Sequence, residues 1–245
     1  MNGELNRHWL NVGAALAIGM VLSSGVFGWF YAKTKKTDDA ITVTGSAKRR
    51  IRSDLVMWSA GVSTQSPQLS EAYKQISDSI PKIRKYLVDK GISENQIQVS
   101  AITTVTLHKQ DEMGRQLNEI TGYSLSQSVS VTSNDVDRIS QIDREATELI
   151  NQGILIESNA PQYYYTKIGD LKVEMLGEAA KDAKTRAEQI AASTGDSIGS
   201  VRSARMGVLQ ITAPDSTEVS DSGIFDTGTI DKDMTAVVNI SFAVD

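Results

Sequence analysis

Residues 168–194 read IGDLKVEMLGEAAKDAKTRAEQIAAST, and this stretch decides what kind of fold the chain adopts. Its apolar residues recur at spacings of three and four, which is the repeat of one face of an α-helix. That face consists of Leu171, Met175, Ala179, Ala183, Ala187 and Ile190. The other positions carry oppositely charged pairs such as Asp182 and Arg186. Pairs of this kind contribute about 0.3 kcal/mol each, so they indicate a solvated face rather than a binding site.

Alternating segments lie on either side of this helix along the chain. After it, Met234–Val244 alternates mainly apolar with mainly polar residues, and near the start of the body Ile41–Ala47 (ITVTGSA) does the same. This is the period of a half-buried strand. Half-buried strands and an amphipathic helix bury their apolar faces against each other, so these segments predict a helix packed on a sheet.

Between them, Leu55–Gln65 is expected to be a strand, and a second helix follows it. Ser66 predicts the N-cap of that helix, Pro67 its first position and Gly91 its end. Pro81 lies inside the helical pattern. Because proline lacks the N–H that a helix interior needs, we expect a kink or two shorter helices.

The middle of the chain predicts a hairpin. Ile97–Gln110 and Ile120–Ser133 read as extended segments on either side of the polar turn 111–115, which contains a glycine. In the second arm, serines alternate with larger residues and give one small, hydroxylated face. Such a face is typical of an antiparallel sheet with one side in solvent, although a face packed against another subunit shows the same pattern.

The remaining body alternates the same two kinds of element. Asn134 is the expected N-cap of a helix that ends at Gly153, and Val201–Thr212 is an expected strand. Short strands are expected at Ile154–Glu157 and Gln162–Thr166, around Pro161.

The order of elements predicts an α+β fold, with antiparallel sheets and helices packed on one side. We expect one domain over residues 41–245, made of two linked sub-units at about 41–133 and 134–245. Residues 213–233 carry six aspartates and glutamates against one lysine, and they predict a long exposed acidic loop.

The N-terminal segment Trp9–Ala32 contains no Asp, Glu, Lys or Arg. As a helix rising about 1.5 Å per residue, it exceeds the roughly 30 Å of a hydrocarbon core. Trp9 lies at one end and Trp29, Phe30 and Tyr31 lie at the other, which suits the two membrane interfaces. We therefore expect an uncleaved transmembrane anchor at residues 9–32, between a flank at 1–8 and a linker at 33–40. The alternative is a cleaved signal peptide, but no A-x-A-like site precedes Lys33.

The composition excludes several classes of site. The chain has no cysteine and two histidines, so thiolate metal sites, iron–sulfur clusters and cysteine nucleophiles are excluded. The formal net charge is −5 and no basic tract occurs, which argues against nucleic acid as a partner. We expect no cofactor.

Several blocks, in this order, resemble the SIMPL-domain family of bacterial envelope proteins, which includes periplasmic immunogen and oxidative-stress-defence members. The blocks are Ile41–Gly45, Gly91-Ile92 with Ile97–Ser100, Ile120–Tyr123, Leu176–Ala191 with Gly195, and the strand–loop–strand that ends at Asp245. The anchor, Pro81 and the acidic loop depart from many members. The resemblance implies an α+β fold of two linked sub-units, a ring- or channel-like homo-oligomer and a link to envelope stress tolerance. It supplies no catalytic residue.

The resemblance also decides the expected location. Lys33, Lys35 and Lys36 after the anchor would favour a cytoplasmic body, because positive charge is enriched on that side. The family's envelope location outweighs these three lysines. We therefore expect a single-pass protein of the bacterial inner membrane with its body on the periplasmic side.

Three acidic residues are the weak candidates for chemistry. Asp226 lies in Phe225-Asp-Thr-Gly-Thr229, which resembles the catalytic loop of aspartic proteases and would need a symmetric dimer. Asp226, Asp231 and Asp233 offer oxygen ligands for calcium, but their spacing fits no EF-hand loop. Turn chemistry and solvated charges explain both patterns without a site.

Other conspicuous side chains are expected to be structural. His108 is expected in a strand near the hairpin tip without a partner, and Trp58 in the core. Tyr163, Tyr164 and Tyr165 alternate between strand faces, so they cannot form one stacking platform.

We therefore expect a non-enzymatic, membrane-anchored protein that assembles with itself into a ring or cage. Its expected partners are other copies and the lipid bilayer. The alternatives are a monomeric or dimeric envelope binding module that uses the loop 213–233 and, remotely, a dimeric aspartic protease.

Overall fold

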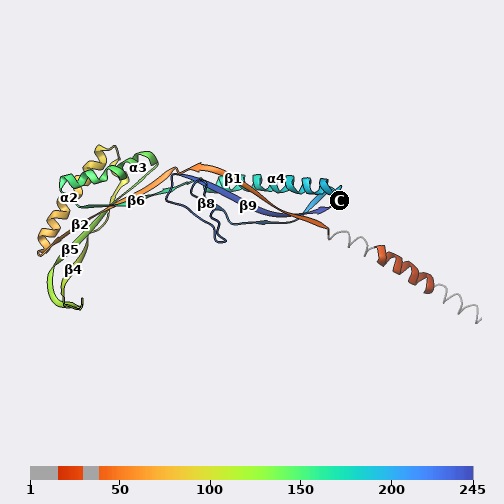
Figure 1. Ribbon diagram of the computed structural model, residues 1–245, viewed down its shortest axis with the longest axis horizontal. Coiled ribbons are helices and arrows are strands. Elements are labelled where there is room, and N and C mark those ends of the chain that lie inside the picture. The colour runs from red at the N-terminus through yellow and green to blue at the C-terminus, as the bar shows by residue number, and fades with distance from the viewer. Residues whose placement is uncertain (1–15, 30–38, 245) are drawn as a thin grey trace, which may run out of the picture. The chain divides into compact units, whose positions relative to one another are not determined.

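The computed structural model describes residues 16–29 and 39–244 of the chain (Figure 1). They form an α+β fold with two antiparallel sheets, which confirms the predicted class. Within residues 39–244 the chain divides into two compact units. The first unit contains residues 39–47, Leu176–Gly207 and 236–244, and the second contains Lys48–Met175 and Val208–Thr235.

This division differs from the expected one at residue 133. Each unit is assembled from segments distant in sequence, because the strands that start and end the body pair with each other. In the first sheet the strand order is β1 (Ala40–Arg52), β9 (Asp231–Val244) and β7 (Ile198–Met206), and β8 (Gln210–Thr212) also pairs with β9. A contiguous cut of the sequence would separate β1 from β9.

In the first unit, α4 (Ile168–Thr194) packs closely on the sheet. Ala179, Ala183 and Ala187 are fully buried at four-residue spacing. Gly45 of β1 lies directly against them, since a Cβ there would overlap the carbonyl oxygen of Ala179 and lie 2.7 Å from Ala183 Cβ. The predicted bounds of this helix are confirmed.

The second unit holds a five-stranded sheet with helices on one face. The strand order is β3-β5-β2-β6, and β4 also pairs with β5. The strands are β2 (Leu55–Ser66), β3 (Ile97–Val99), β4 (Thr103–Gln110), β5 (Gln116–Ser133) and β6 (Ile156–Tyr164). The helices are α2 (Leu69–Asp89), α3 (Val136–Glu145) and the short 3-10 helices η1 (Glu94–Gln96) and η2 (Ala146–Gln152).

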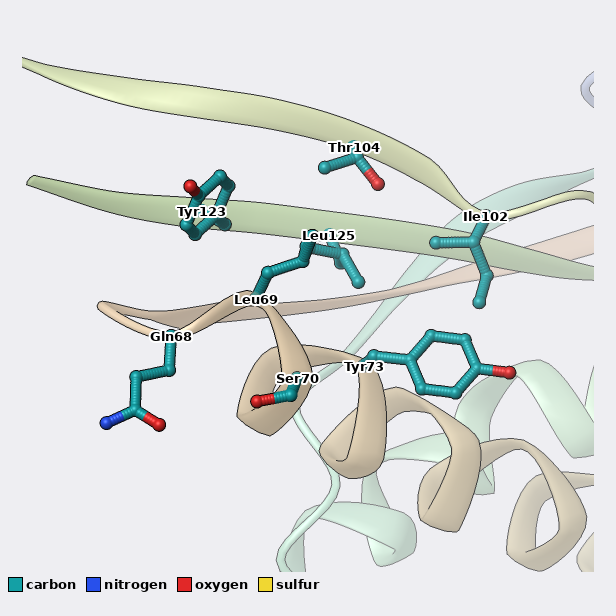
Figure 2. A pocket seen from close by; sticks show the side chains of 8 residues that line it. All are labelled: Gln68, Leu69, Ser70, Tyr73, Ile102, Thr104, Tyr123 and Leu125. Atoms are coloured by element: carbon teal, nitrogen blue, oxygen red, sulfur yellow. The ribbon is translucent and has the colours of Figure 1, made fainter. Parts of the chain in front are cut away.

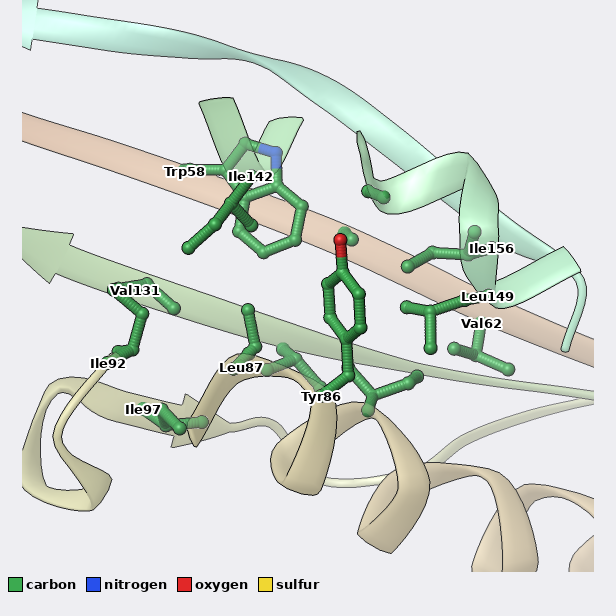
Figure 3. Close-up of a cluster of buried hydrophobic side chains, with 14 of the residues drawn as sticks. Trp58, Val62, Tyr86, Leu87, Ile92, Ile97, Val131, Ile142, Leu149 and Ile156 are labelled. Atoms are coloured by element: carbon green, nitrogen blue, oxygen red, sulfur yellow. The ribbon is translucent and has the colours of Figure 1, made fainter. Parts of the chain in front are cut away.

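The core of the second unit consists of large side chains. Figure 3 shows the ring of Tyr86, from α2, among Trp58, Leu149 and Ile156. Trp58 is 2% exposed, as predicted, and its Nε1 donates to Ser158 Oγ at 2.9 Å. Aromatic and branched side chains therefore fill the space between helix and sheet in the second unit. In the first unit, alanines and a glycine let the helix and the sheet approach each other closely.

Several local predictions are corrected. Helix α2 is continuous through Pro81, because buried side chains before and after it, Ile76 and Ile83, hold both halves on the sheet. Its N-cap is Gln68 and not Ser66, although Ser66 Oγ accepts from the Gln68 N–H.

The later elements also shift. Asp135, rather than Asn134, caps α3 by accepting from the Arg138 N–H. The two short strands expected around Pro161 are one strand, β6, and the segment 201–212 holds two strands, β7 and β8.

The N-terminal prediction is not confirmed. A helix covers the described residues 16–29. Within the described ranges, no helix combines the length and the apolar character needed to cross a membrane. Residues 9–15 and 30–32 of the expected anchor lie outside the described residues, and Trp9, Phe30 and Tyr31 are among them.

Candidate functional site

A groove of about 810 Å³ lies between the first turns of α2 and the strands β4 and β5. Figure 2 shows Leu69 against Leu125, and Tyr73 below Ile102. The full lining is Gln68, Leu69, Ser70, Tyr73, Ile102, Thr104, Tyr123 and Leu125. The side chains of Leu69 and Tyr73 are 45% and 56% exposed, so the groove opens to the surface with apolar walls.

The groove forms because β2 turns sharply into α2 beside β5. Ser66 Oγ donates to Glu71 Oε2 at 2.7 Å and accepts from Gln68 N–H at 3.1 Å, which fixes the reversal of the chain. Gly122 permits β5 to pass close by, since a Cβ there would lie 2.9 Å from the Ser66 carbonyl oxygen. This approach sets Tyr123 and Leu125 beside the start of the helix.

The hairpin of β4 and β5 continues beyond the groove as a two-stranded ribbon, which extends past α2 in Figure 1. Apolar side chains of the β4–β5 hairpin lie in solvent: Val105, beside the groove, is 53% exposed, and Ile120 and Met113, on the ribbon, are 53% and 81% exposed. Two-stranded ribbons are marginally stable in water unless something packs against them. The ribbon therefore has apolar side chains in solvent and, among the described residues, no third strand beside it beyond Leu107.

Polar contacts hold the ribbon in shape. Asp111 Oδ1 accepts from the N–H groups of Met113 and Arg115, both at 2.9 Å, and Gly114 supplies the positive φ of the turn. The Arg115 backbone contact is the main reason that the pKa of Asp111 lies below its ordinary value. Lys109 and Glu119 pair across the strands at 2.9 Å. The predicted hairpin is thus confirmed, and its tip is structured.

The groove lining contains few titratable side chains. Among its eight lining residues, the only titratable groups are the two phenols, Tyr73 and Tyr123. Its other polar groups are the hydroxyls of Ser70 and Thr104 and the amide of Gln68, and the lining contains no carboxylate and no imidazole. Apolar walls with scattered hydroxyl groups suit an apolar or strand-like occupant.

Asp226 serves as an internal anchor point. Its carboxylate accepts from Gly228 N–H at 3.0 Å, from Thr229 Oγ1 and from Lys232 Nζ at 3.1 Å. Burial raises its pKa, but the hydrogen bonds from Thr229 and Lys232 outweigh this, and the pKa lies below its ordinary value. A protease aspartate must share a proton with a second carboxylate, whereas this one is neutralised by a buried lysine.

The other two acidic candidates bind cations of the chain. Asp233 is buried and accepts from Arg50 Nε at 2.8 Å and from Lys48 Nζ at 2.9 Å. Its pKa is held well below the ordinary value, chiefly by the Arg50 hydrogen bond. Asp231 is exposed, with Arg52 at 3.9 Å.

Asp226, Asp231 and Asp233 thus pair with different cationic side chains of the chain. Over residues 16–29 and 39–244, no group of three or more His, Asp or Glu side chains could hold a metal ion. The expected loop 213–233 is also shorter than predicted, because Lys232 and Asp233 are buried in β9.

The remaining candidates are structural. His108 lies in β4 with Nδ1 3.1 Å from the Leu117 carbonyl oxygen. Tyr163 is buried and its hydroxyl lies 2.8 Å from Ser140 Oγ, whereas Tyr164 and Tyr165 are partly exposed. The tyrosines therefore form no single platform, as predicted.

Sequence reasoning did not find the groove, because three separate segments line it. One signal was present: Leu69 and Tyr73 lie four residues apart, one turn along the helix and beside its buried stripe.

Comparison with known proteins gives one informative result. A family model described as SIMPL, protein of unknown function (DUF541), matches residues 41–242. The comparison with curated proteins finds no match.

Proposed function

The chain belongs to the SIMPL family, and from this premise we propose that it is a non-enzymatic protein that assembles with copies of itself at a membrane. The observation that carries the proposal is the ribbon of β4 and β5, which exposes apolar side chains on a protruding sheet edge. Exposed edges of this kind pair with other chains unless charge, proline or a covering element blocks them.

The blocking features are weak on this edge. The segment Thr103–His108 contains no proline and no Lys, Arg, Asp or Glu. The nearest charge, Lys109, is paired with Glu119 of the same hairpin. An edge left open in this way is more consistent with an interface than with a solvated boundary.

Membrane attachment and a periplasmic body complete the proposal. Support comes from the uncharged sequence 9–32 and from the exposed apolar side chains of the helix 16–29, such as Phe27 at 76%. Several anchors on one assembly would bind a bilayer far more firmly than a single anchor. The ring or cage form, and the link to envelope stress, rest on the family resemblance alone.

The test is the mass of the full-length protein in a mild detergent, measured by light scattering with the detergent contribution subtracted. We expect one discrete species whose protein mass is a multiple of 26.6 kDa. A single-chain mass at micromolar concentration would overturn self-assembly.

Membrane attachment is tested separately by fractionation. The chain is expected in the alkali-resistant membrane pellet, and the double variant Leu22→Arg, Val26→Arg is expected to leave it, because charge at mid-span is costly. The matched control Val201→Arg, Met206→Arg introduces the same two charges at exposed positions of β7 and should stay in the pellet. If all three chains fractionate alike, or none is in the pellet, the anchor proposal is wrong.

A further inference from the structure

We propose that β4 pairs with β4 of a second copy, antiparallel, about a two-fold axis that passes Val105. This inference rests on the proposed self-assembly and names the surface that performs it. It commits to one occupant for the open edge, a second copy of this chain.

The register of β5 determines which backbone groups of β4 point outward. The Ser100 N–H donates to the Ser128 carbonyl oxygen at 2.9 Å, so Ser128 directs its backbone groups toward this edge of the sheet. The register of β5 against β2 is regular from residue 123 to residue 133. Because backbone direction alternates along a strand, Ser124 also points toward this edge.

Ser124 is the partner of Val105 in the β4–β5 ladder. The N–H and C=O groups of Val105 therefore point inward, and those of Thr104 and Thr106 point outward. The segment Thr103–Leu107 keeps one regular register with β5, and irregularities begin only at His108. The usable open edge is thus centred on Val105.

An antiparallel partner of the same sequence satisfies these groups by symmetry. With the axis at Val105, Thr104 of one copy lies opposite Thr106 of the other, and each such pair exchanges two backbone hydrogen bonds. A two-fold contact of this kind is self-complementary and closed. An axis at Lys109 would instead set like charges opposite each other, which is unfavourable.

The side chains of β4 are compatible with this register. Val105 is 53% exposed, and the two copies of Val105 would cover each other as a directly opposed pair. Lys109 would lie opposite Ala101, so no two like charges meet.

The pairing would also join the grooves. Thr104 lines the groove from β4, so the two grooves would lie on the same face of one continuous sheet, built from two five-stranded sheets. The groove walls then become part of a larger dimeric surface.

Cysteine cross-linking tests the register directly, because the chain contains no cysteine of its own. Val105 forms a non-hydrogen-bonded pair with itself in the proposed dimer, and such pairs have Cα atoms about 4.5 Å apart. That distance lies within the range of about 4.4 to 6.8 Å that a disulfide spans. Full-length Val105→Cys, oxidised with diamide in detergent, should give a covalent dimer.

The matched control is Ser128→Cys, an exposed serine inside the sheet on β5, which should give at least about tenfold less dimer at equal concentration. A second variant, Thr104→Pro, removes one outward N–H and leaves the β4–β5 ladder intact, since edge strands tolerate proline. Added to Val105→Cys, it should reduce cross-linking to the level of the control.

The outcomes separate the inference from the function on which it rests. If Val105→Cys fails to cross-link while light scattering still shows an oligomer, the β4 interface is wrong and self-assembly stands. If the protein is a single chain, both fail. Equal cross-linking at Val105→Cys and Ser128→Cys would mean random collision and would overturn the interface.

Discussion

The two units solve the same problem, a helix on a sheet, with opposite chemistry. In the first unit, a stripe of alanines on α4 meets Gly45, and the layers approach until backbone atoms are in contact range. In the second, α2 and α3 cover their sheet through large side chains such as Trp58 and Leu87. In the first unit, backbone contact sets the distance between helix and sheet. In the second unit, the volume of the side chains sets that distance.

The two interfaces should therefore be sensitive to opposite kinds of substitution. A closely approached interface has no room for added atoms, so enlargement should damage it. A core of large side chains loses contacts and gains a cavity when one is truncated.

The largest effect is expected from truncation in the second unit. Trp58→Ala removes a ring that is 2% exposed, and it also leaves Ser158 and Asp143 without the indole N–H. We expect a loss of about 4 kcal/mol in the free energy of unfolding, measured by urea denaturation followed by circular dichroism. Met57→Ala, the exposed neighbour on the same strand, should change it by less than about 0.5 kcal/mol. Similar losses of unfolding free energy for Trp58→Ala and Met57→Ala would show that the buried core does not determine the stability of the second unit.

The next effect is enlargement at a strand glycine. Gly45→Ala should cost about 2 kcal/mol, because the new methyl group overlaps the backbone of α4. Gly61→Ala, on β2 in the second unit, meets no atom within 4 Å and should be neutral or slightly stabilising. The same denaturation measurement compares them. A Gly45→Ala variant as stable as the parent would show that the interface between β1 and α4 can relax. The proposed difference between the two units would then be wrong.

The smallest effect concerns acid stability. Asp233 is buried with a lowered pKa, so its ion pairs stabilise the fold at neutral pH, and this contribution is lost as pH falls below about 4. Asp233→Asn should lower the melting temperature at pH 7 and flatten its dependence on pH between 5 and 2.

The matched variant in the first unit is Asp182→Asn. The pKa of Asp182 is also lowered, first by the Ser46 N–H, but its side chain is 33% exposed. Solvent screening should therefore give a smaller change of the same sign. An equal or larger change would contradict the role of burial.

Hydrophobic period predicted most of the fold. The helix 168–194 was predicted at its observed bounds because its apolar spacing and the terminal Gly195 agree with each other. The hairpin around 111–115 was equally clear, since a polar turn with Gly114 separates two β-rich arms. Local signals of this kind suffice when neighbouring residues decide the structure.

Local reasoning failed where distant segments decide the outcome. Pro81 was expected to kink its helix or to divide it into two shorter ones, but buried contacts on both sides keep one continuous helix. Lys232 and Asp233 were assigned to an acidic loop, but pairing with Asp226 and Arg50 buries them. Their patterns in sequence are the same as those of solvated charges.

The class of fold, the helix and strand periods and the absence of cysteine chemistry could all be predicted from the amino-acid sequence, because each depends on composition or on neighbours along the chain. Three features became visible only in the folded chain: which carboxylates are neutralised, which distant segments make up each unit, and that Leu69 and Tyr73 line a groove beside an open strand edge. Those features depend on contacts between residues far apart in the chain, which no local pattern encodes.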